Sequence, residues 1–331
     1  MRQILQFILV SMLLTALSIS CFTHRPSVQL KPPTIKMLKW ISNRCGIDYG
    51  STAVYYKQEN FDEINTLNRN AFLLSSYDTL KGLRLYKTKC RLISFINSFQ
   101  SLRSISITHS DIRSIPVIKI KNLRSLNLSK NSIKKIEGLD KLRYLQYLDL
   151  SGNAINKIQG LEKNKRLIKL KLKDNYISKI EGLKHIRGIL SIDLSENKII
   201  KIHDLTEVSN CMSLSLSGNF IEKEPRKYLH FNDLKSLAKL DNIKILKLRW
   251  NRLRDVSPLK KMKRLAVLDL TGNKISTLEN IFDIKALYIL NLSGNPIISK
   301  LNRTFDTKDT KEEKKMLKVM KQKGINIILY N

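Results

Sequence analysis

Hydrophobic and polar residues follow one pattern that recurs from about residue 80 to residue 300. Its clearest copy, residues 145–155, has the form L-x-x-L-x-L-x-x-N-x-I. Leu145, Leu148 and Leu150 face inward from a short strand, and Ile155 turns back under it. Because one copy cannot cover these side chains alone, several copies must stack. The pattern therefore predicts a repeat array.

An asparagine marks each copy of the pattern. The marks are 22 residues apart, except for one step of 32 after the fifth: Asn131, Asn153, Asn175, Asn197, Asn219, Asn251, Asn273 and Asn295. Two weaker copies have Ser110 and Thr88 at this position, which gives about ten coils. At a tight corner a buried amide can bond the backbone groups that the turn leaves unpaired. Seven residues later, Gly138, Gly160 and Gly182 permit the next chain reversal.

The repeats resemble the 22-residue leucine-rich repeats of the internalins and of the regulatory subunits that bind protein phosphatase-one. I-E-G-L at 136–139 and 180–183 and I-Q-G-L at 158–161 are similar to the second group, and V-S-P-L at 256–259 to the first. The resemblance implies an α/β fold class, a right-handed solenoid with parallel strands on a concave face, short helical turns behind and helical caps at both ends. It identifies no ligand, because such repeats serve many partners.

The pattern divides the chain into five segments. We expect a signal peptide at 1–20, a tether at 21–34, an N-terminal cap region at 35–79, the repeats at 80–302 and a C-terminal cap at 303–331. The cap region has helix-like spacing around a strand-like stretch at 48–56, and an independent module is the alternative. The C-terminal cap should contain an amphipathic helix that Gly324 stops, followed by a strand.

Residues 1–20 have the features of a secretory signal. Arg2 precedes an apolar stretch from Ile4 to Ile19, and the small residues Ser18 and Ser20 lie at positions −3 and −1 before Cys21. The segment around Cys21 resembles the lipobox of bacterial lipoproteins, although Leu17 lies at −4 instead of −3. Lipidation of Cys21 with attachment to the cell envelope, ordinary cleavage with secretion, and an uncleaved anchor all remain open. If residues 1–20 are not a signal, the protein is cytoplasmic.

The residue types and motifs of the sequence favour binding over catalysis. The five histidines are scattered, and the sequence has neither a phosphate-binding glycine loop nor a nucleophile elbow. Cys211 replaces an inward leucine and Cys90 a core position, while a Cys45–Cys90 bridge is an alternative. We therefore expect no enzyme, no cofactor and no metal site.

The charge balance is strongly basic, with 60 Lys and Arg against 28 Asp and Glu, a net charge of +32. The residues six, four and two positions before each Asn mark should line the concave face. Six of these thirty residues are basic and three acidic, a net +3 that matches the average density of the chain. A nucleic-acid groove should concentrate cations and aromatics on one face. We therefore expect a protein partner, with an anionic lipid or polysaccharide surface as a further partner, rather than nucleic acid.

Two groups of concave residues are the partner-binding candidates. The first is Tyr147 beside a row of three lysines, Lys169, Lys171 and Lys173. The second follows the 32-residue step and contains Ile245, Lys247, Arg249 and Trp250. An insert at 224–232 lies beside the second group, as a binding loop or a neutral bulge. Trp250 is either an interface anchor or a packing residue under that insert.

The sequence thus predicts a non-catalytic, exported leucine-rich-repeat protein that binds another macromolecule. An intracellular adaptor, similar to the phosphatase regulators, is the alternative.

Overall fold

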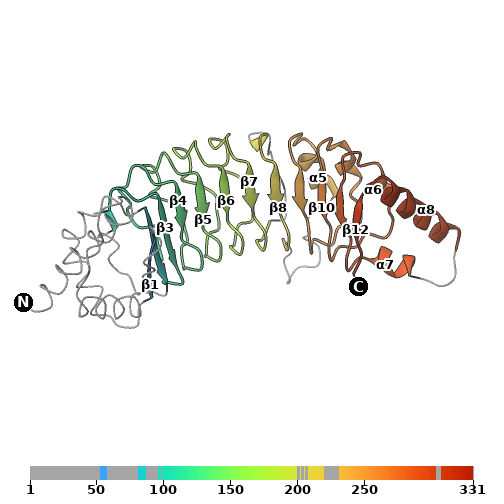
Figure 1. Ribbon diagram of the computed structural model, residues 1–331, viewed down its shortest axis with the longest axis horizontal. Coiled ribbons are helices and arrows are strands. Elements are labelled where there is room, and N and C mark those ends of the chain that lie inside the picture. Colours follow the sequence, from blue (N-terminus) through green and yellow to red (C-terminus); the bar gives the residue numbers. More distant parts are fainter. Residues whose placement is uncertain are drawn as a thin grey trace, which may run out of the picture.

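The computed structural model describes residues 53–57, 81–86, 96–97, 99–199, 202, 205, 208–219, 231–302 and 307–330. In these residues twelve parallel strands form one sheet in strict chain order (Figure 1). The strands are β1 Ala53–Lys57, β2 Gly82–Tyr86, β3 Ser104–Thr108, β4 Ser125–Asn127, β5 Tyr147–Asp149, β6 Lys169–Lys171, β7 Ser191–Asp193, β8 Ser213–Ser215, β9 Ile245–Lys247, β10 Val267–Asp269, β11 Ile289–Asn291 and β12 Asn326–Ile328. This is the parallel-strand solenoid that the repeat pattern predicts, with β2 to β11 at the ten predicted strand positions.

We call the side of the array at the C-terminal ends of the strands the trailing edge. The asparagines form a hydrogen-bonded ladder along it. Asn153 Nδ2 donates to the carbonyl oxygens of Leu128 in the preceding coil, at 3.0 Å, and of Leu150 in its own coil, at 2.9 Å. Its Oδ1 accepts the amide N–H of Ile133 at 3.0 Å. Asn175 repeats the arrangement one coil later. The amides therefore join neighbouring coils where the backbone turns and cannot pair with itself.

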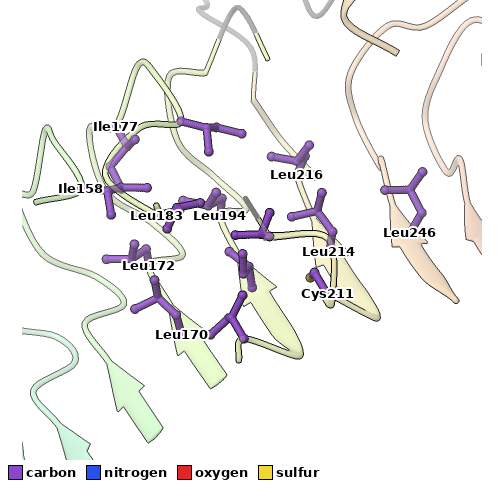
Figure 2. Packing of buried hydrophobic residues seen from close by; sticks show 14 of the residues in the cluster. Ile158, Leu170, Leu172, Ile177, Leu183, Leu194, Cys211, Leu214, Leu216 and Leu246 are labelled. Carbon is purple, nitrogen blue, oxygen red and sulfur yellow. The ribbon is translucent and has the colours of Figure 1, made fainter. Parts of the chain in front are cut away.

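The core lies between the sheet and the turns behind it. Figure 2 shows Leu170, Leu172 and Leu194 among the packed side chains, with Cys211 at a leucine position. Cys211 is 1% exposed, which confirms that it is a core residue. The continuous cluster explains why the coils depend on one another, because each coil covers the apolar face of the next.

The turns behind the sheet are the short helical turns that the resemblance implies, and they are of the 3₁₀ type. In residues 139–145 the chain makes two successive i to i+3 bonds, from Leu142 N to Leu139 O at 2.9 Å and from Leu145 N to Leu142 O at 3.1 Å. Leucines at every third position are buried and the residues between them are exposed. A period of three suits such turns, whereas an α-helix needs apolar residues at i+4 as well.

Helices occur in the described residues after β8. They are α5 Phe231–Leu237, the 3₁₀ helix η3 Ser257–Lys261, α6 Glu279–Phe282, α7 Pro296–Leu301 and α8 Lys308–Gln322. Thr307 caps the N-terminus of α8, because its side chain accepts the N–H of Thr310 at 3.3 Å, and α8 buries Met320. Buried Glu313 of α8 accepts the N–H of Leu278 at 2.8 Å, which joins α8 to the coil that contains α6.

The two ends of the sheet extend the repeat array. β1 falls in the strand-like stretch at 48–56 and pairs parallel to β2, and β12 pairs parallel to β11 after α8. The rest of 35–79, the signal and tether segments at 1–34, Cys45 and Cys90 lie outside the described residues. The division into five segments therefore stays a prediction.

Candidate partner-binding surface

The concave face consists of alternate strand residues in rows that cross the coils. Tyr147 is in register with Lys169, and Lys169 with Ser191, so these three follow one another along a row with a spacing of about 4.8 Å. Leu148 and Leu170, between the concave residues, are fully buried on the other face. The structure thus places the first candidate group together on β5, β6 and the residues just after β6.

Tyr147, Asp149 and Lys171 form a compact cluster at the centre of this group. The Tyr147 hydroxyl donates to Asp149 Oδ2 at 2.8 Å, and Lys171 Nζ lies 3.5 Å from the same oxygen. Burial raises the pKa of Tyr147, and the hydrogen bond and negative charge of Asp149 raise it further. For Lys171 burial lowers the pKa, but the hydrogen bond to Tyr147 and the charge of Asp149 outweigh it, so its pKa is raised. Tyr147 and Lys171 should therefore each lose a proton at a higher pH than an isolated tyrosine or lysine side chain does.

The other two lysines of the row have different surroundings. Lys173 Nζ lies 3.1 Å from Glu196 Oε1, and half of its side chain is exposed. Lys169 Nζ lies 5.9 Å from the centre of the Tyr147 ring, in a cation–π contact, and it is exposed. Two of the three lysines therefore have carboxylate partners within the protein, and Lys169 is the cation most available to a partner.

The acidic residues of the concave face accept hydrogen bonds from the backbone. Asp149, Asp193 and Asp269 each accept the N–H of the residue two positions later, at 3.0–3.1 Å. Asn127 and Asn291 do the same at equivalent positions, at 2.9 and 3.0 Å. The sequence signal is an Asp or Asn two residues before Ser or Thr at the end of a strand, which is typical of an Asx turn. Our sequence count treated these carboxylates as charges facing a partner, and the structure corrects that interpretation.

The second candidate group lies on β9 and the turn that follows it. Ile245 is in register with Val267, and Val267 with Ile289, which gives a row of three half-buried aliphatic side chains across β9, β10 and β11. Lys247 is exposed at the C-terminal end of β9. Arg249 Nε lies 3.7 Å from Asp269 Oδ2. This half of the concave face is therefore apolar along one row and cationic beside it.

Trp250 is exposed at the trailing edge and does not project from a strand. It is 53% exposed, and its backbone φ is +55°. The position just before each Asn has a positive φ in nine successive coils, from His109 to Gly294, so this conformation belongs to the repeat. The indole lies over Gly272, where even a Cβ atom would collide with the ring. Trp250 thus packs one face of its ring against the next coil and leaves the rest open to solvent.

Several sequence predictions concern residues that the structure does not describe. Cys21 and most of the insert at 224–232 lie outside the described residues, so the contact between Trp250 and the insert stays a hypothesis. After the insert the pattern resumes as predicted, with Leu234 and Leu237 fully buried in α5.

The described residues contain few groups suited to chemistry. Burial raises the pKa of the Cys211 thiol to about 11, so it is protonated near neutral pH and a poor nucleophile. In this part of the chain no three His, Cys, Asp or Glu side chains gather as metal ligands. Nor does a helix among the described residues have the length and apolarity to cross a membrane.

Comparisons with known proteins agree with this architecture. Residues 121–163 match the family described as Leucine Rich repeats (2 copies). Among solved structures, an internalin (inlF) from Listeria monocytogenes matches with a TM-score of 0.53 and 22% identity, over 67% of this chain and 63% of that chain. An internalin C2 (inlC2) of the same organism has a TM-score of 0.48 and 22% identity, over 59% of this chain and 80% of that one.

The coverage and the number of these matches decide what they show. This chain spans less than two thirds of the inlF chain. No curated protein matches it. Because 424 solved chains match, the likeness establishes a leucine-rich-repeat solenoid of internalin type and leaves the ligand open.

Proposed function

We propose that this protein is exported, attached to the cell envelope, and binds a protein partner without catalysis. The binding surface is the C-terminal half of the concave face, centred on β9, β10 and β11. Leucine-rich-repeat arrays present extended concave surfaces of this kind to their partners.

The row of Ile245, Val267 and Ile289 carries this proposal. These side chains are half buried on the concave face, where the fold does not require apolar residues, because Lys169, Ser191 and Ser213 occupy the equivalent positions of earlier coils. A partner that covers the row would gain about 25 cal/mol for each Å² of apolar surface removed from water.

Charged and aromatic groups surround this row. Lys247 and Arg249 lie beside the row, and the exposed indole of Trp250 lies at the trailing edge of the same coil as Ile245. Tyr288, 63% exposed, directly precedes Ile289 in the chain. Tyr, Trp and Arg supply most of the energy in protein interfaces, which usually have an apolar centre and a polar rim.

A photo-crosslinker placed at single positions tests the surface. We expect a crosslinker at Val267, on the concave face, to capture one partner in intact cells. At Lys157, exposed in the turn after Asn153 and outside the concave columns, the same crosslinker should not capture it. Capture with equal yield at both positions would contradict the concave site.

The captured partner then allows the role of Trp250 to be measured. Trp250→Ala should weaken binding by about 2 kcal/mol, as for other interface tryptophans. Lys169→Ala should mainly lower the association rate and its salt dependence. Lys171→Ala is a poorer probe, because it also removes the partner of buried Asp149. Lower stability of Trp250→Ala with unchanged affinity would make Trp250 a packing residue and remove the proposed anchor.

Export and attachment rest on residues 1–21. The mass of the mature N-terminus should show cleavage before Cys21 and an added lipid, and Cys21→Ala should release the protein from membranes. An intact Met1 on the cellular protein would contradict export and favour the intracellular adaptor.

A further inference from the structure

The 3₁₀-type turns behind the sheet, such as residues 139–145, lead directly into the strands. We call this side of the array the leading edge, and most of its residues are exposed. Leu139, Leu142 and Leu145 are buried at every third position, and the same spacing recurs at Leu161, Asn164 and Leu167 in the next coil. The residues between them point to solvent. Since i to i+3 backbone bonds close each of these turns, the fold does not dictate which side chains occupy the exposed positions.

Cations occupy most of these exposed positions. Between residues 140 and 190 the leading edge carries seven cations against two carboxylates, Asp140 and Glu162, a net +5: Lys141, Arg143, Lys163, Lys165, Arg166, Lys184 and Arg187. Within the described residues none of the seven forms an ion pair, and Arg166 instead lies 4.5 Å from the centre of the Tyr144 ring. None of these seven residues lies in the concave columns, so the charge of those columns does not reveal this concentration.

A stripe of exposed aliphatic side chains runs beside these cations. Ile168, Leu190 and Met212 are 41%, 39% and 39% exposed, each seven residues before an Asn mark. The N–H of Leu190 donates to the carbonyl oxygen of Ile168 at 2.8 Å, and that of Met212 to Leu190 at 2.9 Å. The three residues are therefore adjacent in three successive coils and form one apolar stripe, bordered by cations.

We propose that this leading edge binds the surface of an anionic lipid bilayer. Its cations would lie against the headgroups, since anionic lipids attract Lys and Arg near the membrane surface. Ile168, Leu190 and Met212 would enter the boundary between headgroups and acyl chains, where buried apolar area adds to binding. A nucleic acid matches less well, because aliphatic side chains do not stack on bases. In this orientation the concave face stays open to a protein partner.

Vesicle binding by the full chain tests the proposal. The titration uses phosphatidylcholine vesicles with and without about one third phosphatidylglycerol, and a single-stranded oligonucleotide serves as a second polyanion. Every variant keeps the same residues 1–34, so vesicle binding through that segment contributes equally to all variants. Binding to the neutral vesicles measures this contribution. We expect the wild type to prefer the anionic vesicles.

Two variants with equal loss of charge separate the leading edge from net charge. Lys163→Gln, Lys165→Gln and Arg187→Gln together remove three cations from the leading edge. The control, Lys134→Gln, Lys157→Gln and Lys179→Gln, removes three exposed cations from the turns after the Asn marks. At about fivefold per cation, the first variant should bind anionic vesicles about 100-fold more weakly. The control should change less than about fivefold, because salt screens charges more than about 10 Å away.

A third variant tests the apolar stripe. Ile168→Ser, Leu190→Ser and Met212→Ser together should weaken vesicle binding at least tenfold, including at high salt, because insertion does not depend on charge. These side chains are exposed, so urea unfolding should show a stability close to wild type.

Each remaining outcome contradicts the proposal. Equal losses in the two charge variants would mean that the net charge of +32 drives binding and the leading edge does not. Oligonucleotide binding as tight as vesicle binding, with no effect of the serine variant, would replace the bilayer by a nucleic acid. Failure of this proposal leaves the concave protein site intact, because the crosslink at Val267 is independent of the leading edge.

Discussion

The two edges of the solenoid use their side chains differently. At the trailing edge asparagine amides satisfy the backbone between coils, and the residue before each Asn has a positive φ. Charges there form closed pairs, such as Lys130 with Asp174 at 2.9 Å. At the leading edge the backbone closes its own turns, and cations between 140 and 190 have no carboxylate partner among the described residues.

This difference separates structural from functional residues. The fold dictates the trailing edge, because a different side chain there leaves buried backbone groups unpaired. It dictates only every third residue of the leading edge. A repeated preference at the other positions, such as that for Lys and Arg, is therefore the better pointer to a binding function.

The largest expected effect breaks the asparagine ladder at the trailing edge. Asn153→Leu removes the partner of the Ile133 N–H and bonds to the carbonyl oxygens of Leu128 and Leu150. The free energy of unfolding should fall by about 3 kcal/mol, the upper part of the range for buried groups left unpaired. The same substitution at exposed Asn156 should change it by less than about 0.5 kcal/mol. Equal urea midpoints for the two variants would remove the structural role from Asn153.

A pair of glycines at the trailing edge shows how firmly Trp250 is packed. Gly272 and Gly294 have φ of +66° and +64°, so alanine at either costs roughly 1–2 kcal/mol. An added Cβ at Gly272 also collides with the Trp250 ring, whereas at Gly294 its nearest contact is an ordinary 3.6 Å to Gly272. Gly272→Ala should therefore cost about 1 kcal/mol more. Adding Trp250→Gly should remove that excess in urea unfolding. Equal costs for both glycines would show that the ring moves away easily.

One asparagine at the leading edge should have the opposite effect to Asn153. Asn164 is fully buried at a position that Leu142 occupies in the preceding coil, and its Oδ1 has no hydrogen-bond partner. Its Nδ2 donates to the carbonyl oxygens of Leu139 and Leu142, which already accept backbone N–H groups. Asn164→Leu should thus raise the free energy of unfolding by about 1 kcal/mol. A loss of stability would mean that these second bonds are needed, and the contrast between the edges would weaken.

The fold could be predicted from the sequence because each repeat has the same pattern of buried and polar positions. The period of the Asn marks predicts the strands, and Leu148 and Leu170 are buried as the alternation requires. The terminal helix and strand after residue 307 could also be expected, from apolar spacing and Gly324. The short helical turns behind the sheet follow from the resemblance, and the buried leucines at every third position show that they are of the 3₁₀ type.

The candidate surface was harder to predict because exposed residues obey no period. The columns identify which residues are concave, but not that Asp149 accepts backbone N–H groups or that Lys171 is paired with it. The position of Trp250 depends on a positive φ, which a bulky residue rarely adopts. The sequence signal for it is the glycine that other repeats have directly before the Asn mark: Gly152, Gly218, Gly272 and Gly294. The cations of the leading edge become visible only when the three-residue turns show which side chains point outward.

The smallest expected effect concerns alkaline pH at the Tyr147 cluster. The pKa values of Tyr147 and Lys171 are raised above their ordinary values of 10.0 and 10.5. A raised pKa in the folded state stabilises the protein below the ordinary value and is lost as the pH rises through the raised one. Stability should therefore fall as the pH rises above the ordinary values of 10.0 and 10.5. The contribution is modest, because both side chains are partly exposed and screened by solvent. Tyr147→Phe should reduce this fall in the urea midpoint, whereas Tyr144→Phe, on an exposed ring, should keep it. If both variants lose stability as the wild type does, the alkaline transition belongs to other groups of the protein.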